Sequence, residues 1–122
     1  RGFVAANAFS LAQAAYTPDA YPLAVCADGE PVGFILYGYD RDFQPPMWGM
    51  WRLMIDKKHQ RKGYGRRALT LLLEKLAQEK GHVPFYTSAK PENESAIAFY
   101  ESMGFCNTGQ LLDGEILLIR EL

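Results

Sequence analysis

The chain has 122 residues, a hydrophobic content of 48% and a formal net charge of −1. This length predicts a single domain over residues 1–122, and the hydrophobic content excludes a disordered chain. A charge near zero offers no overall field for nucleic acid or a membrane surface, and no apolar run is long enough to span a bilayer. Two cysteines without metal-like spacing, and no visible secretory signal, predict a cytoplasmic protein with free thiols and no metal site.

The first half of the chain predicts one helix and three strands. Apolar residues at helical spacing predict a helix over 3–15, which ends before Pro18. Apolar and alternating runs predict strands over 21–27, 31–39 and 47–56. The pair Asp28-Gly29 predicts a tight turn between the first two strands. The third run is apolar on both faces, which is typical of a central strand.

The second half predicts two more helices and three more strands. A leucine stripe predicts a helix over 63–80, capped by Gly81 and followed by a strand over 83–88. A second helix is expected to begin at Asn93, its N-cap, and to stop at Gly104. The last two strands are predicted over 105–111 and 115–122, joined by a hairpin turn at Asp113-Gly114. The order α-β-β-β-α-β-α-β-β predicts a mixed α/β layer fold.

The segment between the third strand and the long helix is rich in basic residues and glycine. Six of the eleven residues from Lys57 to Arg67 are Lys or Arg. Gly63 and Gly65 let backbone N–H groups approach a phosphate closely, and the helix N-terminus that follows favours negative charge. The segment therefore predicts a binding site for a phosphorylated ligand.

Two common phosphate motifs fit this turn poorly. Gly63, Gly65 and Ala68 match the dinucleotide pattern G-x-G-x-x-A, but six polar residues separate the strand from Gly63. The carboxylate that would bind the ribose is also absent from the next strand of the sequence. A mononucleotide P-loop requires Gly-Lys-Ser or Gly-Lys-Thr, which this turn lacks. The pattern Gln60-x-x-Gly63-x-Gly65, between a strand and a helix, is a third candidate.

A second motif, Asn93-x-x-Ala96-x-x-Phe99-Tyr100-x-x-x-Gly104-Phe105, follows about 30 residues later. With both motifs in this order, the sequence resembles the GCN5-related N-acetyltransferase (GNAT) family. The resemblance implies a mixed, mostly antiparallel central sheet flanked by helices. Because the chain opens at Arg1, we expect the family's first strand to be missing from it.

A narrower resemblance is to the bacterial spermine/spermidine (diamine) N-acetyltransferases. It is carried by several short segments, including Phe3-Val-Ala-x-Asn7, Val32-Gly-Phe34, Trp51-Arg-Leu-Met-Ile-Asp56 and Thr108-Gly109. The resemblance implies transfer of an acetyl group from acetyl-CoA to a primary amine of a polyamine.

The family resemblance implies acetyl-CoA as co-substrate. Its pyrophosphate would lie on backbone N–H groups of the glycine turn, and its pantetheine arm would pair along the preceding strand as an added strand. The cofactor-binding residues implied are Leu53, Met54, Ile55, Arg61, Lys62, Gly63, Tyr64, Gly65, Arg66 and Asn93.

The resemblance also implies that Tyr100 protonates the departing CoA thiolate. A phenol with a pKa near 10 and a thiol with a pKa near 8.5 are close enough for this transfer. Asn93 and Tyr100 lie seven residues apart, about two helical turns, and therefore share one face of their helix. A backbone N–H of Met54 or Ile55 is expected to bind the oxyanion.

The sequence does not supply an obvious general base. Some family members carry a Glu early in the central strand, and simple register puts Gly49 at that position. No Asp or Glu lies between Asp42 and Asp56. A water chain, a distant carboxylate and desolvation of the amine all stay open as routes for the proton.

A polyamine acceptor requires carboxylates and aromatic faces. The aromatic residues predicted to bind the substrate are Tyr37, Trp48, Trp51 and Tyr86. Tyr39 is a further aromatic candidate, and the candidate carboxylates are Asp40, Asp42, Glu92 and Glu94.

Two alternative functions stay open. The first is a GNAT enzyme acting on another amine, such as an aminoglycoside, an amino acid or a peptide N-terminus. The second is a catalytically silent sensor that binds acyl-CoA. In every case the expected partner is a small amine or the cofactor, without nucleic acid or membrane, and a homodimer is compatible with the family.

Overall fold

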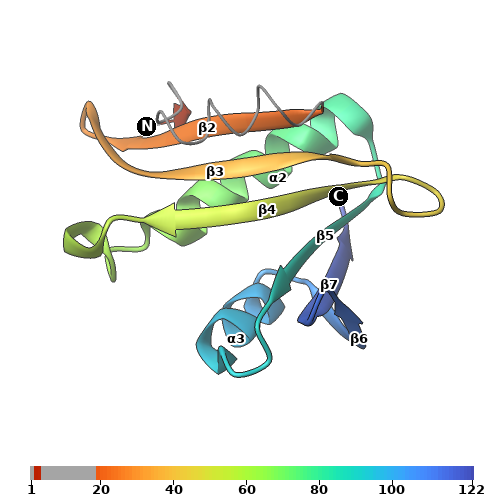
Figure 1. Ribbon diagram of the computed structural model, residues 1–122. Helices are drawn as coiled ribbons and strands as arrows, with labels where there is room; N and C mark the ends of the chain where they lie inside the picture. The colour runs from red at the N-terminus through yellow and green to blue at the C-terminus, as the bar shows by residue number, and fades with distance from the viewer. Residues whose placement is uncertain (1, 4–18) are drawn as a thin grey trace.

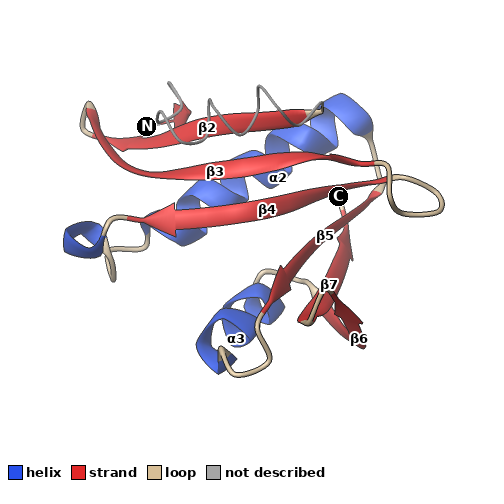
Figure 2. Ribbon diagram, viewed as in Figure 1, coloured by secondary structure: helices blue, strands red, loops and turns tan. Residues whose placement is uncertain are grey.

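The computed structural model describes residues 2–3 and 19–122 and contains one seven-stranded sheet in the order β1-β2-β3-β4-β5-β7-β6 (Figures 1 and 2). The predicted helix over 3–15 is wrong at Phe3, which belongs to the short strand β1 (Gly2–Phe3) paired with β2. The rest of that prediction lies outside the described residues. Among the residues described, no helix is long and apolar enough to cross a membrane.

Three antiparallel strands form one half of the sheet. They are β2 (Ala20–Ala27), β3 (Glu30–Asp40) and β4 (Met47–Ile55). Asp28 and Gly29 turn β2 into β3 with φ angles of 54° and 83°, the left-handed pair that a two-residue hairpin needs. The predicted strands and turn are confirmed, each within one residue of its expected ends.

Helix α2 (Tyr64–Lys80) covers one face of these strands (Figure 1). The predicted leucine stripe makes this contact, because Leu69, Leu72 and Leu76 are fully buried against strand residues such as Ile35 and Met50. The helix ends at Gly81, whose N–H donates to Ala77 O at 2.9 Å and whose φ is 78°. The face of the sheet that carries α2 is called the helix side below.

The other half of the sheet diverges from β4. Strand β5 (Pro84–Ala89) is parallel to β4, and the two pair only at Trp48↔Phe85 and Gly49↔Tyr86. Beyond this point Thr87, at 2% exposure, donates its hydroxyl to Met50 O at 3.2 Å. The side chain therefore satisfies a β4 carbonyl that the diverging β5 backbone no longer reaches.

The remaining elements attach to β5. Helix α3 (Glu94–Ser102) is capped by Asn93 as predicted, because Ala96 N–H donates to Asn93 Oδ1 at 3.1 Å. The closing hairpin consists of β6 (Cys106–Leu112) and β7 (Glu115–Glu121), with β7 paired to β5. Partly buried α3 residues pack against the same core cluster as α2, so both helices lie on the helix side.

A β-bulge at Trp51 changes which residues of β4 face the helix side. Leu36 pairs with Arg52 and Tyr37 pairs with Met50, which leaves Trp51 as the extra residue. Before the bulge, Met50 packs into the core on the helix side, and after it Leu53 does so. The bulge thus keeps both ends of an apolar strand in the core while Trp51 lies on the opposite face, against Gly38.

Candidate active site

The loop between β4 and α2 is folded back onto the end of β4. Gln60 Nε2 donates to Ile55 O at 2.9 Å, across the short 3₁₀ turn η1 (Lys57–His59). Arg61 and Gly63 both have left-handed φ angles, of 65° and 79°. These contacts explain the glutamine of the sequence motif, which ties the glycine turn to the strand before it.

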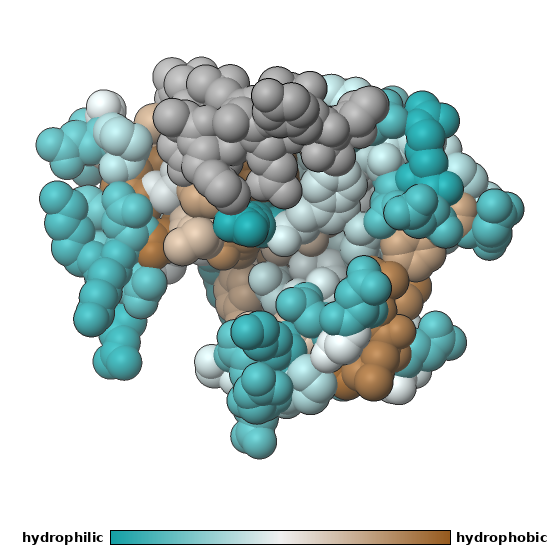
Figure 3. All heavy atoms as spheres, viewed as in Figure 1, coloured by the Kyte–Doolittle hydropathy of each residue, from teal (hydrophilic) through white to brown (hydrophobic). Residues whose placement is uncertain are grey.

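The N-terminus of α2 is prepared for an anion. Arg67 N–H donates to Gly63 O at 3.1 Å, and the N–H groups of Tyr64, Gly65 and Arg66 precede it. By helix geometry these three groups have no acceptor within the helix. Helix N-termini usually carry acidic residues, whereas this first turn carries none and contains Arg66 and Arg67, so the dipole and these side chains together favour an anion at this position. Figure 3 shows hydrophilic atoms gathered at this end of the molecule.

A cavity of about 710 Å³ opens beside this turn, between α2, α3 and the end of β4. We call it the helix-side cavity. Its walls are Leu53, Ile55, His59, Gln60, Arg61, Gly63, Tyr64, Gly65, Arg66, Asn93, Ser95, Ala96, Phe99 and Tyr100.

The helix-side cavity brings together most residues of the predicted cofactor site, from segments that are far apart in the chain. Met54 and Lys62 are the two that do not line it. The Met54 side chain is 53% exposed, and alternation along β4 directs it away from its neighbours Leu53 and Ile55. Only the backbone of Met54 is therefore available on the helix side.

Arg66 links the two helices that flank the cavity. Its guanidinium donates to Ser102 Oγ at 2.7 Å and to Met103 Sδ at 3.2 Å. The Cζ atom of Arg66 also lies 5.5 Å from the centre of the Phe99 ring. These contacts hold the start of α2 against the end of α3. Arg66 thus has a structural role in addition to the positive charge that it brings to the cavity.

Tyr100 lines the helix-side cavity from α3. Burial raises the pKa of Tyr100 above its ordinary value, and a hydrogen bond with the Thr87 side chain opposes part of this shift. The phenol therefore keeps its proton throughout the neutral range. Asn93 lines the same cavity, and because its carboxamide oxygen caps α3, its NH₂ group is the part available to a ligand.

A second cavity, of about 430 Å³, lies on the opposite face of the sheet and is called the far-side cavity. Its walls are Asp40, Asp42, Phe43, Trp51, Tyr86, Leu112 and Asp113. Tyr86 faces this side because its neighbour Phe85 is in the core beneath the helices and successive strand residues alternate. Three carboxylates and three aromatic rings therefore surround one opening at the point where β4 and β5 separate.

The four aromatic residues predicted to bind substrate divide between the two faces. Trp51 and Tyr86 line the far-side cavity and are joined by a hydrogen bond of 2.7 Å from Trp51 Nε1 to Tyr86 Oη. Tyr37 and Trp48 belong to the helix side, where their rings lie 6.2 Å apart and Lys80 Nζ lies 4.0 Å from the centre of the Trp48 ring.

Some cavity residues carry no signal in the sequence. The sequence assigns Asp113 only to a hairpin turn, Phe43 to a loop, and Leu112 to the position just after a predicted strand. Their position depends on the β6–β7 hairpin meeting the loop after β3, which short-range patterns do not encode. In the described part of the chain, no group of three or more His, Cys, Asp or Glu residues is arranged to hold a metal ion.

Comparison with known proteins decides the family. The family described as Acetyltransferase (GNAT) matches residues 4–105. The chain belongs to this family. The resemblance found in the two motifs is thereby confirmed, and this GNAT protein is an enzyme of the acetyltransferase class.

Individual relatives agree with the narrower resemblance. A Spermine/spermidine N(1)-acetyltransferase of Bacillus subtilis (strain 168) is 33% identical to this chain over 106 residues, which is 83% of this chain and 70% of the relative.

Solved structures show the same fold. An acetyltransferase from Thermus thermophilus superposes with a TM-score of 0.77 at 22% identity, covering 92% of this chain and 70% of that one. The PaiA N-acetyltransferase from Thermoplasma acidophilum, in complex with coenzyme A, has a TM-score of 0.71 at 19% identity, covering 93% of this chain and 68% of that one.

Proposed function

We propose that this GNAT protein transfers the acetyl group of acetyl-CoA to a primary amine of a polyamine such as spermidine or spermine. The observation that carries the proposal is the pair of cavities on opposite faces of the sheet, where β4 and β5 separate. One cavity is cationic and ends at a helix N-terminus, as a pyrophosphate requires. The other is acidic and aromatic, as a polycation requires. The name of the Bacillus relative supports the polyamine class.

The residues of the helix-side cavity fit acetyl-CoA. The proposal assigns the pyrophosphate to the N–H groups between Arg61 and Arg66, with Lys62 adding charge from outside the cavity. The pantetheine arm would pair with β4 at Leu53, Met54 and Ile55, on the edge that β5 leaves unpaired. The amide of Asn93 faces the same cavity and can bind a pantetheine carbonyl.

Tyr100 is the proposed acid for the departing thiolate. Burial raises the pKa of Tyr100, so the phenol is protonated at neutral pH and has a proton to give when the carbon–sulfur bond breaks. The backbone N–H of Met54 or Ile55 is the proposed donor to the oxyanion, since both belong to the strand that would carry the pantetheine arm.

The acceptor is assigned to the far-side cavity. Trp51 and Tyr86 supply aromatic faces, and Asp40, Asp42 and Asp113 supply negative charge for the ammonium groups of a polyamine. The proposal leaves Tyr37 and Trp48 out of direct acceptor contact, because they pack with the helix side and do not line this cavity.

The proposal is tested by measuring thiol release from acetyl-CoA with spermidine, spermine, an aminoglycoside, lysine and a short peptide as acceptors. We expect turnover with the polyamines at a kcat/KM at least about tenfold higher than with the other amines, a difference of about 1.4 kcal/mol in transition-state stabilisation. Turnover with the peptide alone would contradict the polyamine assignment. Tight binding of CoA without turnover of any amine would favour an acyl-CoA sensor instead.

A further inference from the structure

The amine substrate must lose a proton, and β4 offers no carboxylate to take it. An alkyl amine has a pKa near 10.4 and is an ammonium ion at neutral pH, so it cannot attack a carbonyl carbon until the proton leaves. Gly49 occupies the β4 position that carries a Glu in some family members. A Cβ placed on Gly49 would collide with the ring of Tyr86, so the space for a side chain from β4 is already filled.

Tyr86 links this space to a carboxylate from another strand. Its ring lies against Gly49 at 4% exposure, and its hydroxyl donates to Asp40 Oδ2 at 2.7 Å. Trp51 Nε1 donates to the same hydroxyl oxygen at 2.7 Å. A phenol oxygen has two lone pairs, and Trp51 uses one of them. The other lone pair can accept a hydrogen bond from an ammonium group in the far-side cavity.

We propose that Asp40 receives the proton of the acceptor ammonium through the Tyr86 hydroxyl. The inference rests on the proposed acetyl transfer and identifies the base that the β4 sequence lacks. Asp40 stands at the end of β3, and it is brought to β5 only by the sheet. The pair replaces a carboxylate on β4 with a phenol from β5 and a carboxylate from β3.

The protons transferred in the reaction balance between the amine, Tyr86, Asp40, Tyr100 and solvent. The ammonium N–H passes its proton to Tyr86 Oη as the Tyr86 proton passes to Asp40, which leaves a neutral amine, a neutral phenol and a protonated Asp40. The amine nitrogen then bonds to the acetyl carbon, and the carbon–sulfur bond breaks with the thiolate taking the Tyr100 proton. The partly exposed Asp40 returns its proton to water, and the excess proton on the amide nitrogen restores the Tyr100 phenol or is lost to solvent.

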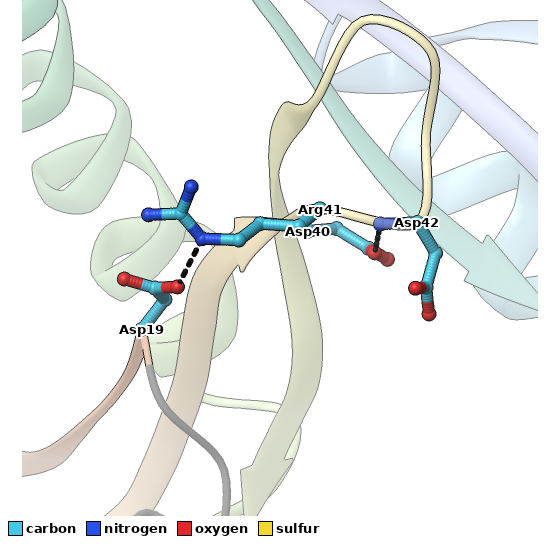
Figure 4. Close-up of polar contacts among 4 residues, drawn as sticks. All are labelled: Asp19, Asp40, Arg41 and Asp42. Atoms are coloured by element: carbon cyan, nitrogen blue, oxygen red, sulfur yellow. Dashed lines mark hydrogen bonds and ion pairs between the residues drawn. The ribbon is translucent and has the colours of Figure 1, made fainter.

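The surroundings of Asp40 keep its carboxylate available for this role. Figure 4 shows Arg41 directed away from Asp40 and paired with Asp19 at 2.7 Å. Asp40 Oδ1 accepts the backbone N–H of Asp42 at 2.9 Å, which fixes the carboxylate and leaves Oδ2 for Tyr86. The other charged groups lining the cavity are the carboxylates of Asp42 and Asp113. Burial, followed by the hydrogen bond to Asp40, raises the pKa of Tyr86, so the phenol is neutral between transfers.

The test compares Asp40→Asn and Tyr86→Phe with Asp42→Asn, a variant that removes one negative charge from the same cavity and no hydrogen bond to Tyr86. Acetylation of spermidine is measured as kcat and KM from pH 7 to pH 10, with CoA affinity and melting temperature recorded for each protein. We expect Asp40→Asn and Tyr86→Phe to lower kcat at pH 7 by roughly 100- to 10,000-fold. The deficit should shrink as the pH approaches the pKa of the amine, because free amine then needs no base.

The control separates proton transfer from attraction of the substrate. Asp42→Asn is expected to raise KM by less than about tenfold, with kcat and the shape of its pH profile as in the wild type. Equal effects of Asp40→Asn and Asp42→Asn, both on KM alone, would overturn the proposal. A kcat deficit in Asp40→Asn that is the same at every pH would also overturn it. Tyr86→Phe removes only a hydroxyl and provides the same test if Asp40→Asn does not fold.

These outcomes are distinct from a failure of the proposed function. If the wild-type protein acetylates none of the amines, the proposed acetyl transfer itself is refuted. If the wild-type protein acetylates spermidine and Asp40→Asn has an unchanged kcat, only the assignment of Asp40 as the base is refuted, and the proposed acetyl transfer stands.

Discussion

Replacing Gly65 with Ala should separate ligand binding from stability. Gly65 is the second residue of α2 and lines the helix-side cavity. A Cβ at this position would meet only Ile55 Cγ1, at 3.8 Å, which is an ordinary van der Waals contact. The protein itself therefore accepts alanine, and the added methyl group would lie at the helix N-terminus to which the proposal assigns the pyrophosphate.

Gly65→Ala should leave the stability of the protein unchanged or higher while it lowers the affinity for CoA. Alanine is favoured over glycine in a helix by up to about 1 kcal/mol, so the melting temperature of Gly65→Ala should be unchanged or a few degrees higher. Loss of one hydrogen bond between a backbone N–H and a charged phosphate costs about 1.5–3 kcal/mol. At about 1.4 kcal/mol per factor of ten, the Kd for CoA should rise by roughly 10- to 150-fold.

Calorimetric titration of CoA and thermal unfolding measure the two effects. Gln78→Ala, on an exposed position of the same helix, is the control and should leave CoA affinity unchanged. An unchanged Kd in Gly65→Ala would show that the glycine turn is not the pyrophosphate site. A clear fall in melting temperature would show that the packing argument at Gly65 is wrong.

Three further predictions concern neighbouring parts of the site. Gln60→Glu replaces the amide that donates to Ile55 O with a carboxylate that the carbonyl repels, so CoA should bind at least about tenfold more weakly; calorimetry checks this. Tyr100→Phe should lower kcat by roughly 100-fold or more. Because burial raises the pKa of Tyr100, the phenol stays protonated up to about pH 10, and a pH–rate profile of the wild type should show no loss of kcat from its ionisation below that pH. Gly49→Ala forces its methyl group into the Tyr86 ring and should destabilise the fold by about 1–3 kcal/mol in denaturant unfolding, whereas unchanged stability would mean that Tyr86 can move aside.

Local patterns predicted most of the elements because each depends on neighbours in the chain. Leucines at helical spacing specify α2, and the Asp-Gly pairs at 28–29 and 113–114 specify left-handed turns with φ angles of 51° to 83°. The N-cap of Asn93 is equally local. The wrong assignment of Phe3 to a helix has the converse cause, since β1 exists only through its pairing with β2.

The bulge at Trp51 shows where local patterns fail. In a strand that is apolar on both faces, either set of alternate residues could face the helix side. Only the pairing with β3 reveals that Trp51 is the extra residue. That single residue places Trp51 on the far side while Leu53 stays on the helix side. Trp48 and Trp51, by contrast, are three residues apart in β4, so alternation alone already places them on opposite faces.

The sequence by itself determined the family, the glycine turn and the candidates Asn93 and Tyr100, because these lie in two contiguous motifs whose chemistry depends on spacing along the chain. Only the tertiary structure decided which carboxylate of the far-side cavity pairs with Tyr86. Asp40 and Tyr86 are 46 residues apart and are joined by a 2.7 Å hydrogen bond across the sheet. Such a pair depends on strand order and register, which are set by the packing of the whole chain.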